Sequence, residues 1–280
     1  GHSAFHLLSR GPGANVGPMP RTARASCGRL VYHVLKRGNG RAEVFPKPGD
    51  YQAFLRLLAE ACDRLPMRLL SYCLMPNHFH LVLWPHEDGD LGRWMQWLLT
   101  SHVRRYHRHY HSSGHVWQGR FNSLLKNGDW LRLNPEKPWK FLCLPVPVPF
   151  FQQAVKAFPV QEDEHFLTVC RYVERNPLRA GLVRRAERWA WSSLSAGELV
   201  DEQGHSLNKK LALAAWPLRR PKDWLEWVNG VETAAELAAL RRRLERGAPF
   251  GDDAWAEKTA AALGLESSLR PRGRPKKAEK

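Results

Sequence analysis

The sequence predicts an α+β fold, in which helices cover one face of an antiparallel sheet. Two observations carry this prediction. Short segments that alternate apolar and polar residues, as strands do, lie between longer segments whose apolar residues recur at helical spacing. Over residues 29–110 these segments come in the order strand, helix, strand, strand, helix. That order opens a ferredoxin-like arrangement, which a final strand and helix should complete.

The first strand is expected at residues 29–35, and a basic loop that contains glycine follows at 36–41. The loop either receives a phosphate on its backbone amides and arginines or is an ordinary solvated turn. Residues 50–65 have apolar side chains at helical spacing behind a capping aspartate, so they predict a helix. Two strands should follow, at 67–74 and 78–84, joined by a Pro-Asn turn.

A longer helix is expected over residues 90–110, and its C-terminal end is strongly basic. Arg104, Arg105 and Arg108 lie there, interleaved with histidines. Cations suit the C-terminal end of a helix dipole, so a solvated helix end is one interpretation. The charge of the whole chain favours the other interpretation, which is contact with a phosphate backbone.

The last strand of the sheet has two candidates. Residues 119–121 begin a suitable segment, but residues 127–151 contain a Pro-Val-Pro-Val-Pro run and show no clear period. Alternation returns at residues 155–160. We therefore expect an insertion at about residues 123–153 that interrupts the last strand. Residues 121–123 and 155–158 both stay open as that strand.

Composition divides the chain into three predicted parts. Residues 1–28 are rich in Gly, Pro, Ser and Arg without an apolar period, which predicts a disordered basic arm. Residues 29–198 form the main domain, and residues 199–280 form a helical accessory region. Its tail contains Arg272-Gly273-Arg274-Pro275, the core of an AT-hook, which inserts arginines into the minor groove of A·T-rich DNA. A plain disordered basic end is the alternative.

Charge is the strongest global signal. The chain has 43 Lys and Arg against 27 Asp and Glu, a net charge of +16 and a pI of about 10.1. Such an excess favours polyanionic partners, and nucleic acid is favoured over a membrane because no apolar span or amphipathic anchor occurs. The five cysteines show no pairing pattern, which favours a reducing compartment and argues against a structural zinc.

Two segments carry residues suited to chemistry. His78 and His80 alternate on one strand and so point the same way; two imidazoles can hold a divalent metal if a third ligand joins them. Two strand histidines on a wet face are the commoner case for such a pair alone. Residues 162–176 predict a helix that ends before Pro177. Tyr172 and Asn176 lie one turn apart on its flank, which predicts a boundary position for the tyrosine, neither buried nor fully free.

Several motifs occur together in an order that resembles one family. They are Tyr32-His33-Val34 followed by Arg37-Gly38-Asn39-Gly40, the Tyr72–His80 stretch, the His115–Phe121 stretch and the Arg171–Val183 stretch. Together they resemble the single-tyrosine HUH transposases, and among these the REP-associated tyrosine transposases. The resemblance covers about residues 29–193, apart from the insertion.

The resemblance implies a ferredoxin-like core that nicks and rejoins single-stranded DNA next to hairpins through a 5′-phosphotyrosine. Tyr172 would be the nucleophile, and His78, His80 and Asn176 would hold Mg²⁺ or Mn²⁺. We expect DNA contacts from Arg37, Arg41, Arg104, Arg105, Arg108, Arg120, Arg272 and Arg274. The implied protein is bacterial, cytoplasmic and nucleoid-associated, a monomer or homodimer, and it does not bind membranes.

Two other functions compete with this hypothesis. A catalytically inactive protein derived from such a transposase would bind hairpins and A·T-rich DNA through its basic helix and tail. A metal hydrolase for small molecules fits the His-x-His pair, but it leaves the positive charge and the tail unexplained.

Overall fold

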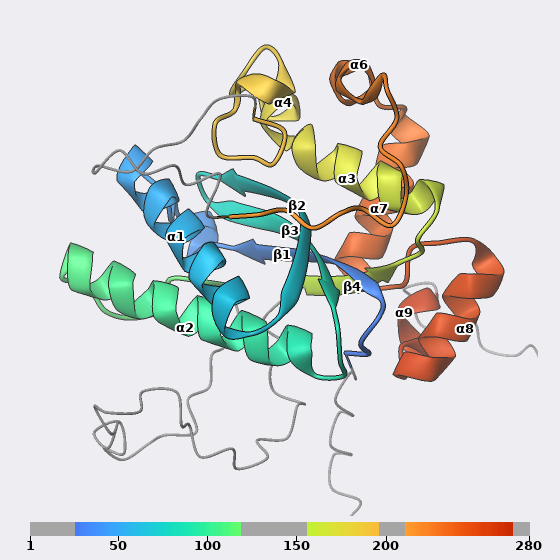
Figure 1. The fold of residues 1–280 in the computed structure, drawn as a ribbon, viewed down its shortest axis with the longest axis horizontal. Coiled ribbons are helices and arrows are strands. Elements are labelled where there is room, and N and C mark those ends of the chain that lie inside the picture. The colour runs from blue at the N-terminus through green and yellow to red at the C-terminus, as the bar shows by residue number, and fades with distance from the viewer. Residues whose placement is uncertain (1–25, 119–155, 196–210, 271–280) are drawn as a thin grey trace, which may run out of the picture.

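A four-stranded antiparallel sheet lies at the centre of the computed structural model, which describes residues 26–118, 156–195 and 211–270 (Figure 1). The strand order is β2-β3-β1-β4. The strands are β1 (Val31–Arg37), β2 (Met67–Met75), β3 (His78–Pro85) and β4 (Lys156–Val160). The helices and short 3-10 turns are η1 (Asn39–Arg41), α1 (Pro48–Arg64), α2 (Asp90–Tyr110), α3 (Glu164–Glu174), α4 (Asn176–Arg179), η4 (Ala186–Arg188), α6 (Trp224–Asn229), α7 (Ala234–Arg246), α8 (Asp253–Leu263) and α9 (Glu266–Leu269).

The α+β class and the ferredoxin-like antiparallel sheet predicted from the sequence are confirmed. Helices α1 and α2 cover one face of the sheet, as expected (Figure 1). Phe54 of α1 and Trp94 of α2 are fully buried there, in one cluster with Val34 and Leu81 of the strands. These apolar residues alternate along each strand, so the strands present an apolar face to α1 and α2.

The opposite face is covered as well, by α3 and by helices of the predicted accessory region. Phe166 of α3, Trp224 of α6 and Leu240 of α7 form a second buried cluster with Val82 and Phe158 of the sheet. The expectation of helices on one face therefore holds for α1 and α2, while α3, α6 and α7 form a third layer. Residues after 210 share a core with the sheet.

The last strand is β4, at Lys156–Val160. It pairs with β1 in antiparallel register, from Leu35 opposite Lys156 to Val31 opposite Val160. The second of the two sequence candidates thus lies in the sheet. The first candidate, at residues 121–123, and the predicted insertion at 123–153 lie outside the described residues, as do the first 25 residues of the predicted N-terminal arm and the tail from residue 271.

The outer edge of β2 is covered by the chain that follows α4. The amide of Leu74 donates to the carbonyl of Trp191, and the amide of Ser193 donates to the carbonyl of Tyr72, both at 2.9 Å. The indole N–H groups of Trp189 and Trp216 donate to further β2 carbonyls at 2.8 Å. Because an open edge invites pairing with other chains, these bonds protect the sheet. Within the described ranges, no helix is long and apolar enough to cross a membrane.

Candidate active site

Two histidines of β3 lie on the face that α3 covers. The ring centroids of His78 and His80 are 5.0 Å apart, with an interplanar angle of 78°. His80 is buried, and His78, next to the Pro76-Asn77 turn, is half-buried. The alternation of β3 therefore brings both imidazoles to one side of the sheet, as the sequence predicts.

Tyr172 reaches the same place from α3. Its ring meets that of His80 edge-on, with 5.6 Å between the ring centroids. The predicted boundary position is wrong, because Tyr172 is buried and only 8% exposed. The guanidinium of Arg179 lies 4.1 Å from the centre of the phenol ring and covers it. The flank of α3 that carries Tyr172 thus faces the sheet, and the side chain of Arg179 shields the phenol ring. Helical spacing alone does not predict this shielding.

Asn176 begins α4, one turn after Tyr172. It is buried, and its amide Nδ2 has no hydrogen-bond partner among the residues that the structure describes. A half-turn of the amide exchanges its nitrogen for its oxygen. In the described part of the chain, Asn176 thus has an amide nitrogen without a partner, on the flank that carries Tyr172.

His33 of β1 is a third histidine in this cluster, and the site prediction did not include it. Its Nε2 lies 2.9 Å from Nδ1 of His80, and the two rings stack with 5.1 Å between their centroids. His33 is fully buried. The signal was the pairing of β1 with β3: Leu35 lies opposite His80, so His33, two residues earlier, shares its face.

Burial keeps these imidazoles neutral. Loss of water lowers the pKa of His78 to about 4, and the charges of Arg37 and Arg179 act in the same direction. Burial lowers the pKa of His33 to about 3 and that of His80 well below its usual value. A neutral imidazole keeps a lone pair, which a metal ligand needs.

The donor set fits a divalent ion bound by nitrogen and oxygen. The neutral imidazoles of His78 and His80 are nitrogen donors of this kind, and Asn176 has an amide whose Nδ2 lacks a partner among the described residues. In the parts of the chain that the structure covers, no group of three His, Cys, Asp or Glu side chains is arranged to hold a metal. The set therefore depends on the amide as its third member.

Glu174, between Tyr172 and Asn176, anchors α3. Its carboxylate is fully buried and accepts hydrogen bonds from Ser193 and from the indole of Trp224, both at 2.7 Å, and from Ser71 of β2 at 3.3 Å. Arg220 contacts the same carboxylate at 3.1 Å. Burial raises the pKa of Glu174, while Arg220 and the hydrogen bonds oppose that shift. The carboxylate thus joins α3 to β2 and to the C-terminal region.

Glu232 links the C-terminal region to the cover of Tyr172. Its carboxylate lies 2.7 Å from the guanidinium of Arg179 and 3.3 Å from that of Arg175. All three side chains are largely buried. Arg179 also donates to the carbonyl of Tyr172 at 3.2 Å. Glu232 and this carbonyl together hold the guanidinium over the phenol ring.

The arginines predicted to bind DNA fall into separate places. Arg37 ends β1 directly opposite His78, and Arg41 is exposed in η1 next to it. Gly38 is required between them, because a Cβ there would collide with the carbonyl of Ala42. Arg104, Arg105 and Arg108 are exposed on α2, the helix on the other face of the sheet, and three more lie outside the described residues: Arg120, Arg272 and Arg274.

The family model described as "Transposase IS200 like" matches residues 26–128. The resemblance predicted from the motifs is confirmed over these residues. The IS200-like transposase match includes β1, β2, β3 and both histidines of β3, and it ends before Tyr172. A search of the curated proteins gives no match.

Solved structures similar to this chain include one of a transposase. It is described as the structure of the REP-associated tyrosine transposase bound to a REP hairpin. It is 13% identical, with a TM-score of 0.41, and the similarity covers 68% of this chain and 96% of the other.

Proposed function

We propose that this protein is a tyrosine transposase, which nicks and rejoins single-stranded DNA next to hairpins. The observation that carries the proposal is the contact of Tyr172 on α3 with His80 on β3, at 5.6 Å between ring centroids. Further support comes from the IS200-like transposase match, which includes His78 and His80. The proposed hairpin substrate rests on the motifs that resemble REP-associated transposases.

The proposed reaction exchanges one phosphoester bond for another. The phenol oxygen of Tyr172 attacks a backbone phosphorus in line, and its proton passes to solvent. The bond from phosphorus to the 3′ oxygen breaks, and that oxygen leaves as a 3′-OH after taking up a proton. The DNA 5′ end stays on the tyrosine, so attack by another 3′-OH reseals the strand without ATP and returns the phenol.

His78, His80 and Asn176 are the residues that would hold Mg²⁺ or Mn²⁺. When bound, such an ion polarises a non-bridging phosphate oxygen and offsets the negative charge of the transition state. The protein contributes neutral imidazoles, because burial holds the pKa of His78 near 4. It also contributes position, since the Glu174 network fastens α3 to β2.

The proposed DNA contacts begin beside the site. Arg37 and Arg41 lie at the end of β1 next to His78, where they would bind the phosphates that flank the cleaved bond. The arginines of α2 would bind a more distant part of the strand. We include the AT-hook-like tail as a contact to A·T-rich duplex. In this proposal the protein acts in the bacterial cytoplasm near the nucleoid, as a monomer or homodimer.

Replacement of the nucleophile tests the proposal. We expect wild type with Mn²⁺ to form a covalent adduct with a labelled oligonucleotide that carries a hairpin, visible on a denaturing gel. Tyr172→Phe removes one oxygen and should abolish the adduct, while hairpin affinity stays within about twofold. An adduct of undiminished yield in the variant would overturn the assignment.

An inactive DNA-binding protein is the second candidate, and the burial of Tyr172 favours it. The tyrosine is 8% exposed, and Arg179 lies over its ring. This candidate predicts hairpin binding that falls steeply with salt and is indifferent to EDTA. It also predicts no nicking by wild type in Mn²⁺, which the same gel measures.

A further inference from the structure

His33 is a buried histidine of the site, and the proposed chemistry gives it no role. Its Nε2 lies 2.9 Å from Nδ1 of His80, and its own Nδ1 is buried without a partner among the described residues. We propose that His33 is a positioning residue: it accepts the Nδ1 proton of His80 and so leaves Nε2 of His80 free to bind a metal ion. This inference rests on the metal-assisted function proposed above.

The neighbouring histidine shows how such a proton is fixed. The amide nitrogen of Asn77 donates to the carbonyl of Arg41 at 3.2 Å, so its oxygen must be the atom that faces His78. That oxygen lies 2.6 Å from Nδ1 of His78 and can only accept. The proton of His78 therefore lies on Nδ1, and Nε2 has the lone pair.

The proton of His80 can likewise lie on Nδ1 or on Nε2, and the side chain that faces Nδ1 is His33 rather than an amide. The two facing nitrogens share one proton. If His33 donates it, a neutral His80 must carry its own proton on Nε2 and cannot bind an ion there. If His80 donates it, Nε2 is free and His33 keeps its proton on Nδ1, the atom without a partner. Both ligand histidines then present Nε2, and each has a partner that orients its ring.

Metal binding and the position of the proton test the proposal without any DNA. Two variants separate hydrogen bonding from packing: His33→Gln keeps an acceptor, and His33→Leu removes it. We expect His33→Leu to weaken Mn²⁺ binding, measured by the signal of free Mn²⁺ in electron paramagnetic resonance, roughly 10–100-fold. His33→Gln should recover most of the affinity. In ¹⁵N-detected spectra of metal-free wild type, His80 should carry its proton on Nδ1.

The outcomes separate this inference from the proposed function. Wild type that binds no Mn²⁺ would overturn both the metal-assisted role and the positioning role. Equal Mn²⁺ affinity of wild type and His33→Leu would overturn the role of His33 and leave the function standing. If His33→Leu does not fold, the wild-type spectrum decides, because a proton on Nε2 of His80 contradicts the proposal.

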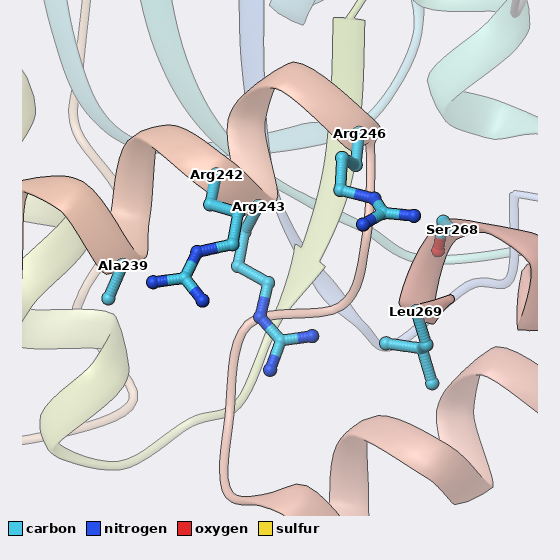
Figure 2. A pocket seen from close by; sticks show the side chains of 6 residues that line it. All are labelled: Ala239, Arg242, Arg243, Arg246, Ser268 and Leu269. Atoms are coloured by element: carbon cyan, nitrogen blue, oxygen red, sulfur yellow. The ribbon is translucent and has the colours of Figure 1, made fainter. Parts of the chain in front are cut away.

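A separate observation concerns α7, far along the chain from the histidines. Figure 2 shows the side chains of Arg242, Arg243 and Arg246 at a hollow between α7 and α9. Its volume is about 340 Å³, and Ala239, Ser268 and Leu269 complete its lining. Residues 239, 242, 243 and 246 follow the spacing of one helix face, whereas Leu240 and Leu244 are buried on the side that faces the sheet.

Three guanidinium groups on one helix face repel one another unless an anion joins them. Arg243 approaches Asp253 at 3.9 Å, but that carboxylate is 98% exposed, so the pair is weak. Within the described residues, Arg242 and Arg246 form no ion pair. We infer that this hollow, the arginine hollow, binds phosphate groups of the DNA backbone. Guanidinium forks match phosphate oxygens, and among the described residues no aromatic side chain lines the hollow to stack a base.

Salt dependence of hairpin binding tests the arginine hollow; this inference also rests on the proposed function. Each lost phosphate contact should make the slope of log K against log [NaCl] shallower by about 0.7–0.9. For the triple variant Arg242→Gln/Arg243→Gln/Arg246→Gln we expect the slope to be shallower by one to three times this amount. Fluorescence anisotropy at several salt concentrations measures it. Arg241→Gln, an exposed neighbour that does not line the hollow, is the matched control.

Each outcome has one meaning. Wild type that binds no hairpin would overturn the proposed function. Hairpin binding with the same slope for the triple variant and the Arg241→Gln control would overturn the arginine hollow alone.

Discussion

The two faces of the sheet are built from different side chains. Towards α1 and α2 the central strands present Val34, Leu81 and Leu83, which pack against aromatic side chains of the helices. Towards α3 the same strands present His33 and His80 among their apolar residues. The second face is thus the one on which the buried histidines of the site lie.

The difference separates stability from chemistry. Buried apolar side chains stabilise a fold without needing partners of defined geometry. Buried imidazoles, carboxylates and guanidinium groups cost free energy unless each is neutral or paired, so their presence points to a use. The polar face also needs the C-terminal region, because Trp224, Arg220 and Glu232 hold α3 and Arg179 in place.

The largest effect on stability is expected from the apolar face. Phe54 is fully buried on α1, and Phe54→Ala should lower the free energy of unfolding by about 3–5 kcal/mol, measured in urea. Adduct formation per folded molecule should stay near the wild-type level. Phe166→Ala is the matched variant on α3, at the other face of the sheet. It should cost a similar amount of stability, and adduct formation should fall as well. Equal adduct yields would break the distinction between the faces.

Loss of the Glu174 carboxylate should have the next largest effect. Glu174→Ala removes the hydrogen bonds from Ser71, Ser193 and Trp224, at about 1 kcal/mol each, so about 3 kcal/mol in total. Glu174→Gln keeps an acceptor oxygen and should cost roughly 1 kcal/mol. Urea unfolding followed by tryptophan fluorescence measures both. If the two variants lose the same stability, packing rather than hydrogen bonding holds α3.

The local sequence pattern predicts most strands of the sheet. It does not predict which side chains contact His80 and Tyr172 from other parts of the chain. The alternation in β3 predicts that His78 and His80 share a face, and helical spacing predicts the flank of Tyr172. His33 was missed because its role depends on the register between β1 and β3. The burial of Tyr172 depends on Arg179 and Glu232, which no local period connects.

The last strand shows the same limit. Two segments had suitable alternation, and only the pairing of Lys156–Val160 with β1 distinguishes β4. Long-range pairing is a property of the whole fold, so a single segment does not encode it.

An effect on stability of intermediate size is expected from a histidine on the apolar face. His102 is buried, and loss of water lowers its pKa to about 3. The unfolded chain takes up a proton below about pH 6.5 and the folded chain does not, so stability falls as pH falls from 6.5 towards 3. Between pH 7 and pH 5 this histidine alone should cost about 2 kcal/mol. His102→Leu should remove that part of the pH dependence in urea unfolding, and an unchanged dependence would contradict it.

The smallest effect on stability is expected from Glu232→Gln, which weakens two partly buried ion pairs. The cost should be about 1 kcal/mol, because both arginines keep a neutral acceptor. The effect on chemistry should exceed it: Arg179 is freed from its fixed place over Tyr172, and adduct formation should fall roughly tenfold. Glu245→Gln, an exposed position on α7, controls for the lost charge. If both variants form the adduct at the wild-type rate, the C-terminal region stabilises α3 without positioning the tyrosine.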